Sequence, residues 1–138
     1  MSSPLLFMLD TDTVSFVLRD IGTTAANLLK QSPSATCMSA ITLSELRFGA
    51  DKRKSKRLHN LIDAFCRTVH VVPFGVSEAA FFGRVRTKLE SSGTPIGLLN
   101  TLIAAHALAL NLTLVTNNTK HFAKVQGLKT RNWSQETG

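Results

Sequence analysis

Apolar residues gather in short runs, separated by longer segments in which apolar and polar positions are mixed. The runs predict strands at residues 4–9, 35–39, 69–74, 112–118 and 128–133. The segments between them predict helices at residues 12–20, 23–31, 40–50, 56–67, 77–93 and 100–111. Strands that alternate with helices favour an α/β fold with a mainly parallel central sheet flanked by helices on both faces.

Residue types at the helix ends sharpen these boundaries. Ser77 is a good N-cap for the helix over residues 77–93, which Gly93 ends, and Gly49 closes the helix over residues 40–50. Asn100 is likewise a good cap at the start of residues 100–111. An amide there is explained by capping alone, unless other residues give the position a second role.

Length and composition predict one domain over residues 1–138, because 43% of the residues are hydrophobic and no repeat or linker interrupts the chain. The N-terminal apolar run is short, lacks a basic flank and ends at Asp10. It therefore predicts a buried strand, and neither a signal peptide nor a membrane span. Cys37 and Cys66 show no metal-binding or redox spacing, so we expect buried reduced thiols and a cytoplasmic protein.

The net charge of +7 indicates a polyanionic partner, nucleic acid first. Two groups of cations stand out, and as groups they favour phosphate contacts, although any single lysine is explained by solvation. They are Lys52, Arg53, Lys54, Lys56 and Arg57 in one segment, and Arg84, Arg86 and Lys88 in the other. No aromatic residues interleave with them and the chain has no Tyr, so base-stacking platforms are not expected.

Candidate chemistry lies after the strands, since active sites of parallel sheets lie outside the carboxyl ends of the strands. That rule selects Asp10 and Asp12 after the first strand, and Thr116, Asn117 and Asn118 after the fourth. Glu45 and Asn100 join them if their helices start near the same edge.

A carboxylate directly after a buried strand is desolvated unless a cation or hydrogen bonds compensate it, so Asp10 is a candidate metal ligand. Helix capping is the alternative for both aspartates; it suits Asp12 better, and Asp12 stays evenly divided between the two roles. Glu45 alone is explained by pairing with Arg47 or Lys52 on a solvated helix. Beside Asp10, it would supply the oxygen ligands that Mg²⁺ or Mn²⁺ prefers.

Other catalytic motifs are weaker. "FMLDTDTV" fits the D-x-D-x-[T/V] pattern of haloacid-dehalogenase-like phosphatases, with Asp10 as nucleophile and Asp12 as general acid. That family needs a later acidic pair for Mg²⁺, whereas the only acid after Glu90 is Glu136. His106 lies in an apolar helix and is expected to be a partly buried structural histidine.

Four segments, "FMLDTDTVSFVL", "MSAITLSELRFGA", "GTPIGLLNTLIAAHALALNLTLVTNNTKHF" and "VQGLKTRNW", closely resemble PIN-domain ribonucleases of the VapC toxin type, in order from about Phe7 to Trp133. The resemblance implies a parallel sheet with an acidic pocket and Mg²⁺- or Mn²⁺-dependent cleavage of RNA, with tRNA the favoured target. It also implies a homodimer, and a VapB-type antitoxin whose C-terminal segment wraps the toxin and blocks the pocket.

Residue by residue, the family's first acid falls on Asp10 and its helical acid on Glu45. The third acid falls on Asn100, and a polar loop position falls on Asn118, with Thr116 just before it. Asp12 stands where the family usually has Asn. Asp10 and Asn100 would thus be metal ligands, with Glu45 and Asn118 as further catalytic residues.

Asn100 departs from the family pattern, and Leu98 or Leu99 stands where Pro is common. An amide keeps one acceptor oxygen but removes a full negative charge beside a cation. We therefore expect a weakened or inactive ribonuclease, whether the change was introduced or is natural. A catalytically silent domain that binds only RNA or its antitoxin is the alternative.

Overall fold

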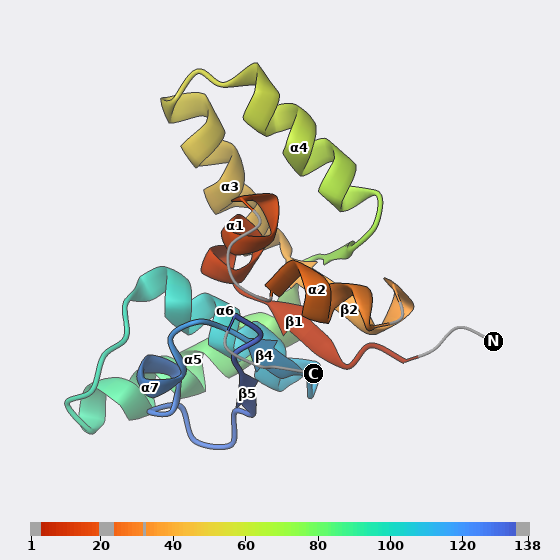
Figure 1. Cartoon of the computed structure of the whole chain (residues 1–138). Helices are drawn as coiled ribbons and strands as arrows, with labels where there is room; N and C mark the ends of the chain where they lie inside the picture. The colour runs from red at the N-terminus through yellow and green to blue at the C-terminus, as the bar shows by residue number, and fades with distance from the viewer. Residues whose placement is uncertain (1–3, 20–23, 32, 135–138) are drawn as a thin grey trace.

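The computed structural model describes residues 4–19, 24–31 and 33–134, and its described strands form one five-stranded parallel sheet in the order β3-β2-β1-β4-β5 (Figure 1). The strands are β1 (Phe7–Leu9), β2 (Thr36–Ser39), β3 (His70–Val72), β4 (Thr113–Val115) and β5 (Thr130–Arg131). All four pairings are parallel, with Leu9 facing Met38 on one side and Val115 on the other. The predicted α/β fold with a parallel sheet is confirmed.

Helices connect successive strands. They are α1 (Thr11–Arg19), α2 (Thr24–Leu29), α3 (Ala40–Lys52), α4 (Lys56–Cys66), α5 (Val76–Ser91), α6 (Leu98–Ala109) and α7 (Thr119–Phe122), with a 3₁₀ turn at Pro33–Ala35. All six predicted helices are present; residues 20 and 23, at the ends of two of them, lie outside the described residues. The α3–α4 hairpin rises away from the sheet, so that its turn lies far from the strands (Figure 1).

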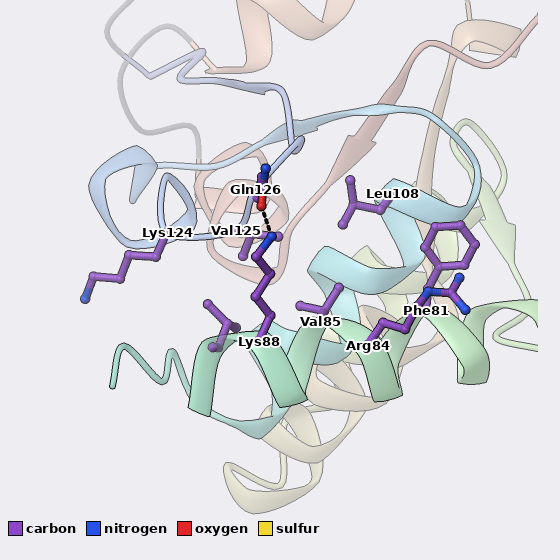
Figure 2. A pocket seen from close by; sticks show the side chains of 9 residues that line it. Phe81, Arg84, Val85, Lys88, Leu108, Lys124, Val125 and Gln126 are labelled. Atoms are coloured by element: carbon purple, nitrogen blue, oxygen red, sulfur yellow. Dashed lines mark hydrogen bonds between the residues drawn. The ribbon is translucent and has the colours of Figure 1, made fainter. Parts of the chain in front are cut away.

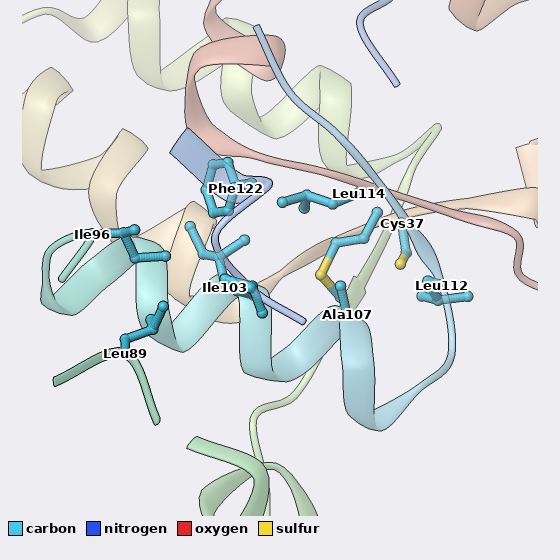
Figure 3. Packing of buried hydrophobic residues seen from close by; sticks show 11 residues of the cluster. Cys37, Leu89, Ile96, Ile103, Ala107, Leu112, Leu114 and Phe122 are labelled. Carbon is cyan, nitrogen blue, oxygen red and sulfur yellow. The ribbon is translucent and has the colours of Figure 1, made fainter. Parts of the chain in front are cut away.

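Two apolar clusters cover the two faces of the sheet. Met8, Leu114 and Phe122 pack against Ile103 of α6 on one face (Figure 3). Leu9 belongs to the other cluster, with residues of α1, α3 and α4 and with Trp133. Because successive side chains of a strand point to opposite faces, a strand buried on both reads as an unbroken apolar run.

The two cysteines differ in burial. Cys37 is a buried free thiol, as predicted, and burial raises its pKa to about 12. Cys66 is free but only half-buried, since it sits at the end of the amphipathic helix α4.

The helix boundaries differ from the prediction by one or two residues, including those at the three helices whose end residues the sequence had singled out. Helix α3 continues past Gly49 to Lys52. Helix α5 begins at Val76, and the Glu78 carboxylate accepts the N–H of Gly75 at 2.6 Å in place of a Ser77 cap. Helix α6 begins at Leu98 after Gly97, whose φ of 93° favours glycine. Asn100 is therefore the third residue of the helix, and its prediction as the cap is wrong.

No helix among residues 4–19, 24–31 and 33–134 combines the length and the apolar character needed to cross a bilayer.

Candidate active site

The candidate site lies at the C-terminal end of β1. This strand is flanked by β2 on one side and by β4 on the other, so the order of the strands reverses direction there. Ligands of open parallel sheets bind at such switch points, outside the carboxyl ends of the strands. Asp10 and Thr116 directly follow the two adjacent strand ends, and the Asp10 N–H donates to the Val115 carbonyl at 3.0 Å. The two polar segments that the sequence selected thus meet at one place.

The Asp10 side chain is only 4% exposed, and its Oδ1 accepts the N–H of Thr13 at 2.9 Å. Asp10 therefore caps α1, while Asp12 is an exposed residue of the first turn. Capping had suited Asp12 better than Asp10, but the structure gives the cap to Asp10, because the helix starts one residue earlier than predicted.

Burial raises the pKa of Asp10 above its ordinary 3.8, and hydrogen bonds from Thr116 and Thr13 offset part of that effect. No described Lys, Arg or His forms a salt bridge with it. Capping therefore satisfies one oxygen of Asp10 but does not compensate its buried charge, and a bound cation would do so.

Glu45 is joined to the same segment by a residue that sequence reasoning missed. The Thr11 hydroxyl donates to Glu45 Oε1 at 2.6 Å, and Thr11 directly follows Asp10. The alternative partner of Glu45, Arg47, instead bonds Asp63 at 2.5 Å and His59 at 3.0 Å. Lys52 lies 6.0 Å from the Phe48 ring. Glu45 thus faces Thr11 and does not form the predicted surface ion pair.

The loop after β4 orders the opposite side of the site. Thr116 is fully buried and its hydroxyl accepts the N–H of Asn118 at 3.0 Å, so its own proton is free to be donated to Asp10. Asn118 caps α7 by accepting the N–H of His121 at 3.3 Å. Neither α7 nor His121 was singled out from the sequence, because a helix of four residues leaves no periodic pattern.

Asn100 joins the network through a backbone carbonyl. Its Nδ2 donates to the Ile96 oxygen at 3.0 Å, and the same oxygen accepts His121 Nε2 at 2.8 Å. Hydrogen bonds therefore link Asn100 through His121 and Asn118 to Thr116 and Asp10. This arrangement fixes the amide orientation and leaves Asn100 Oδ1 as the atom that can face a cation.

The PIN-domain family model matches residues 7–128. The chain belongs to the PIN-domain family. The match replaces the phosphatase interpretation of "LDTD", and it covers both strand ends that carry Asp10 and Thr116.

Within this family the similar proteins are VapC ribonucleases. The tRNA(fMet)-specific endonuclease VapC of Shigella flexneri is 34% identical, over 94% of this chain and 99% of the relative. Ribonuclease VapC2 of Rickettsia felis is 33% identical, over 95% and 100%. VapBC2 of R. felis, solved bound to a DNA fragment from the promoter, matches with a TM-score of 0.88 at 32% identity, over 94% and 99%. DNA-bound VapBC of Salmonella typhimurium also matches with a TM-score of 0.88 at 32% identity, over 94% of this chain and 98% of the matched chain. The chain is an RNA-cleaving hydrolase of the VapC type.

PIN nucleases generally depend on a divalent metal. The oxygen ligands that this chain offers fit such a cation only in part. The carboxylates of Asp10 and Glu45 and the amide oxygen of Asn100 are donors of the kind that Mg²⁺ prefers. The described residues nevertheless contain no group of three or more acids, histidines or cysteines placed to hold a metal.

His106 stays outside the site. It is fully buried, its Nδ1 lies 2.8 Å from Ser39 Oγ, and Phe74 packs against its ring edge. Burial lowers its pKa and keeps the ring neutral. It is a core residue, more buried than predicted.

The predicted basic groups lie on exposed parts of the α3–α4 hairpin and of helix α5. The first, from Lys52 to Arg57, forms the turn at the end of the α3–α4 hairpin, where Lys54 adopts a φ of 51°. In the second, Arg84 stacks on Phe81 with 4.6 Å between guanidinium and ring centroid, and Arg86 pairs with Glu90 at 3.0 Å.

Proposed function

We propose that this VapC-type ribonuclease is the toxin of a type II toxin–antitoxin pair and cleaves tRNA in a reaction that needs Mg²⁺ or Mn²⁺. The observation that supports the proposed centre best is Asp10, a buried carboxylate with no basic partner among the described residues, at the switch point of a parallel sheet. Incubation of tRNA with the Asn100→Asp protein and with the unmodified chain, in Mn²⁺, Mg²⁺ or EDTA, tests it. Cleavage that persists in EDTA would contradict it.

Asp10 and position 100 are the proposed metal ligands, with Glu45 as a further catalytic residue. The chemistry that a divalent ion would supply there is the activation of water and the neutralisation of phosphate charge. The residues of the chain hold the donors in place: Thr116 orients Asp10, Thr11 orients Glu45, and Asn118 fixes the loop that carries Thr116. Asp12, exposed on the first turn of α1, is proposed as a supporting residue only.

The choice of tRNA rests on relatives that are named as tRNA(fMet)-specific endonucleases. We propose tRNA(fMet) as the first substrate to test, with other structured RNA next. Positive charge supports an RNA ligand: the chain carries +7, and the turn at the end of the α3–α4 hairpin is exposed.

Neutralising that turn should weaken RNA binding and its dependence on salt. The triple variant Lys52→Gln, Lys54→Gln, Lys56→Gln should flatten the slope of log K against log salt by roughly 0.7 for each phosphate that no longer meets a lysine. Fluorescence anisotropy with tRNA in EDTA measures it. The exposed pair Lys30→Gln, Lys129→Gln, outside both basic groups, is the control; an equal slope change there would assign the turn to ordinary surface charge.

Thr11→Val should lower cleavage about tenfold, measured in a protein that carries Asn100→Asp. The substitution keeps the branched shape but removes the donor to Glu45, and a hydrogen bond to a charged group contributes roughly 1.5–3 kcal/mol. Thr11→Ser should recover the rate, and RNA affinity should stay unchanged in both. A loss of affinity in place of rate would mean that Thr11 contacts RNA.

A VapB-type antitoxin is the proposed protein partner, because the structural neighbours at 32% identity are VapBC complexes. We propose that its C-terminal segment covers the pocket and that the toxin forms a homodimer within the larger assembly. Co-expression with a candidate VapB-type antitoxin, followed by light scattering, tests both points; a free monomer that does not bind the candidate antitoxin would contradict them.

A further inference from the structure

A cavity lies away from the Asp10 centre, between α5, the end of α6 and the loop that follows α7 (Figure 2). Its volume is about 260 Å³. Its floor is apolar, formed by residues such as Val85, Leu108 and Val125. The volume lies below the roughly 300–1,000 Å³ typical of sites for drug-sized ligands, so it suits a single ring system better than a whole cofactor.

The rim of this α5–α6 cavity is cationic. Arg84, Lys88 and Lys124 line it, and none of its lining residues is acidic. Lys88 reaches from α5 to Gln126, whose side-chain oxygen accepts its hydrogen bond across the opening (Figure 2). An apolar floor inside a ring of positive charge selects a ligand with a flat apolar part and a phosphate or carboxylate beside it.

Arg84 decides between ligand classes. Its guanidinium carbon lies over the Phe81 ring, 4.6 Å from the ring centroid, and both residues line the cavity. Nucleic-acid bases stack on aromatic rings and on guanidinium planes, whereas an acidic peptide needs charge and apolar contact but no such plane. The cavity and the proposed centre also share one helix: Leu108 follows Asn100 on α6 by about 12 Å of helix rise, the length of roughly three or four stacked nucleotides.

We propose that the α5–α6 cavity is a base-binding subsite for the RNA substrate, in which the apolar floor and Arg84 hold one base while Lys88 and Lys124 contact its phosphates. The inference rests on the proposed RNA cleavage. It differs from the sequence-based expectation that the chain has no base-stacking platform. Phe81 and Arg84 are not adjacent in the sequence and come together through the helical spacing of α5.

The test measures binding without cleavage, in EDTA at fixed salt, by fluorescence anisotropy. The probes are a single-stranded RNA of ten nucleotides and its fully abasic counterpart, which carries the same phosphates. The unmodified chain should bind the base-containing RNA at least fivefold more tightly, since stacking of one base contributes on the order of a fivefold to hundredfold gain.

Arg84→Lys is the decisive variant, because it keeps the positive charge at an exposed position but removes the plane. It should reduce the base-containing to abasic affinity ratio at least threefold and leave the salt slope unchanged. Leu108→Ala, which trims the floor, should do the same. The exposed Arg67→Lys, at the end of α4, is the matched control and should leave the ratio unchanged.

The outcomes separate this inference from the proposed function. If RNA binds but Arg84→Lys and Leu108→Ala leave the ratio unchanged, the subsite is wrong and the ribonuclease proposal stands. If these variants instead weaken only the antitoxin complex, the cavity binds peptide and the inference is overturned. If neither probe nor tRNA binds the unmodified chain, both proposals fall together.

Discussion

The unmodified chain is expected to cleave RNA feebly or not at all, and Asn100→Asp is expected to make it a strongly metal-dependent ribonuclease, toxic in cells that lack the antitoxin. The substitution adds a carboxylate where the hydrogen-bond network ends at the Ile96 carbonyl. At ~4 Å and an effective dielectric of ~20, one unit charge against another gives about 4 kcal/mol before desolvation, and more against a divalent ion. Even a third of that energy corresponds to a roughly tenfold increase in metal affinity. Calorimetric Mn²⁺ titration and tRNA cleavage measure it.

The stability of the fold should change little in the same variant. The hydrogen bond to Ile96 is removed, which costs roughly 0.5–1.5 kcal/mol, but an acid in the first turn of α6 interacts favourably with the helix dipole. Asn111→Asp, exposed beyond the far end of α6, makes the same change in net charge and is the control. Full activity of the unmodified chain, unchanged by Asn100→Asp, would contradict the assignment of position 100.

If the Asn100→Asp protein binds RNA but stays silent with ample metal, the chain is a binding module and not a nuclease. RNA affinity and cleavage are therefore measured on the same samples.

Asp10→Asn should abolish cleavage in the Asn100→Asp background and, with EDTA at neutral pH, raise the free energy of unfolding. Asn keeps the cap of α1 but removes a buried charge that lacks a basic partner. Asp10→Ala also removes the charge but loses the cap, which costs roughly 1 kcal/mol, so it should be less stable than Asp10→Asn. Thermal and urea unfolding measure the order.

The pH dependence follows from the raised pKa of Asp10. A group whose folded-state pKa is raised contributes stability while protonated, and this contribution is lost as pH rises through the folded pKa. The stability advantage of Asp10→Asn should therefore be absent below about pH 3.8, the ordinary pKa, and grow as pH rises above it. Mn²⁺ should stabilise the unmodified chain and leave Asp10→Asn unaffected. An Asp10→Asn protein that unfolds more easily at neutral pH would make Asp10 purely structural.

The strands and the position of Asp10 could be predicted because both depend on local patterns. Short apolar runs are what strands buried on two faces require, and Met8 and Leu9 indeed enter different clusters. A polar residue that ends such a run is expected at the end of the strand, where the chain leaves the sheet, and Asp10 lies there.

The contacts that order the site could not be predicted, because they join distant segments. Thr11 reaches Glu45 across 34 positions, and nothing around either residue signals the pairing. Asn100 fits the preferences for a cap, yet the φ of 93° at Gly97 starts the helix earlier, and the Ile96 carbonyl takes both the amide and His121. Arg47 is a plausible local partner of Glu45 in the sequence. In the structure, Arg47 instead contacts Asp63 and His59 of α4.

Crystals of the Asn100→Asp protein and of the unmodified chain, soaked in Mn²⁺ and measured for anomalous scattering, test the central claim most directly. That claim is that Asp10 and position 100 hold one divalent ion at the end of β1. A strong peak is expected in the variant within bonding distance of an Asp10 oxygen and of the new carboxylate, close to the ~2.1 Å of Mg²⁺–oxygen bonds. A weaker peak at the same place is expected in the unmodified chain. No peak beside Asp10 in either crystal, or a peak that position 100 does not contact, would contradict the account.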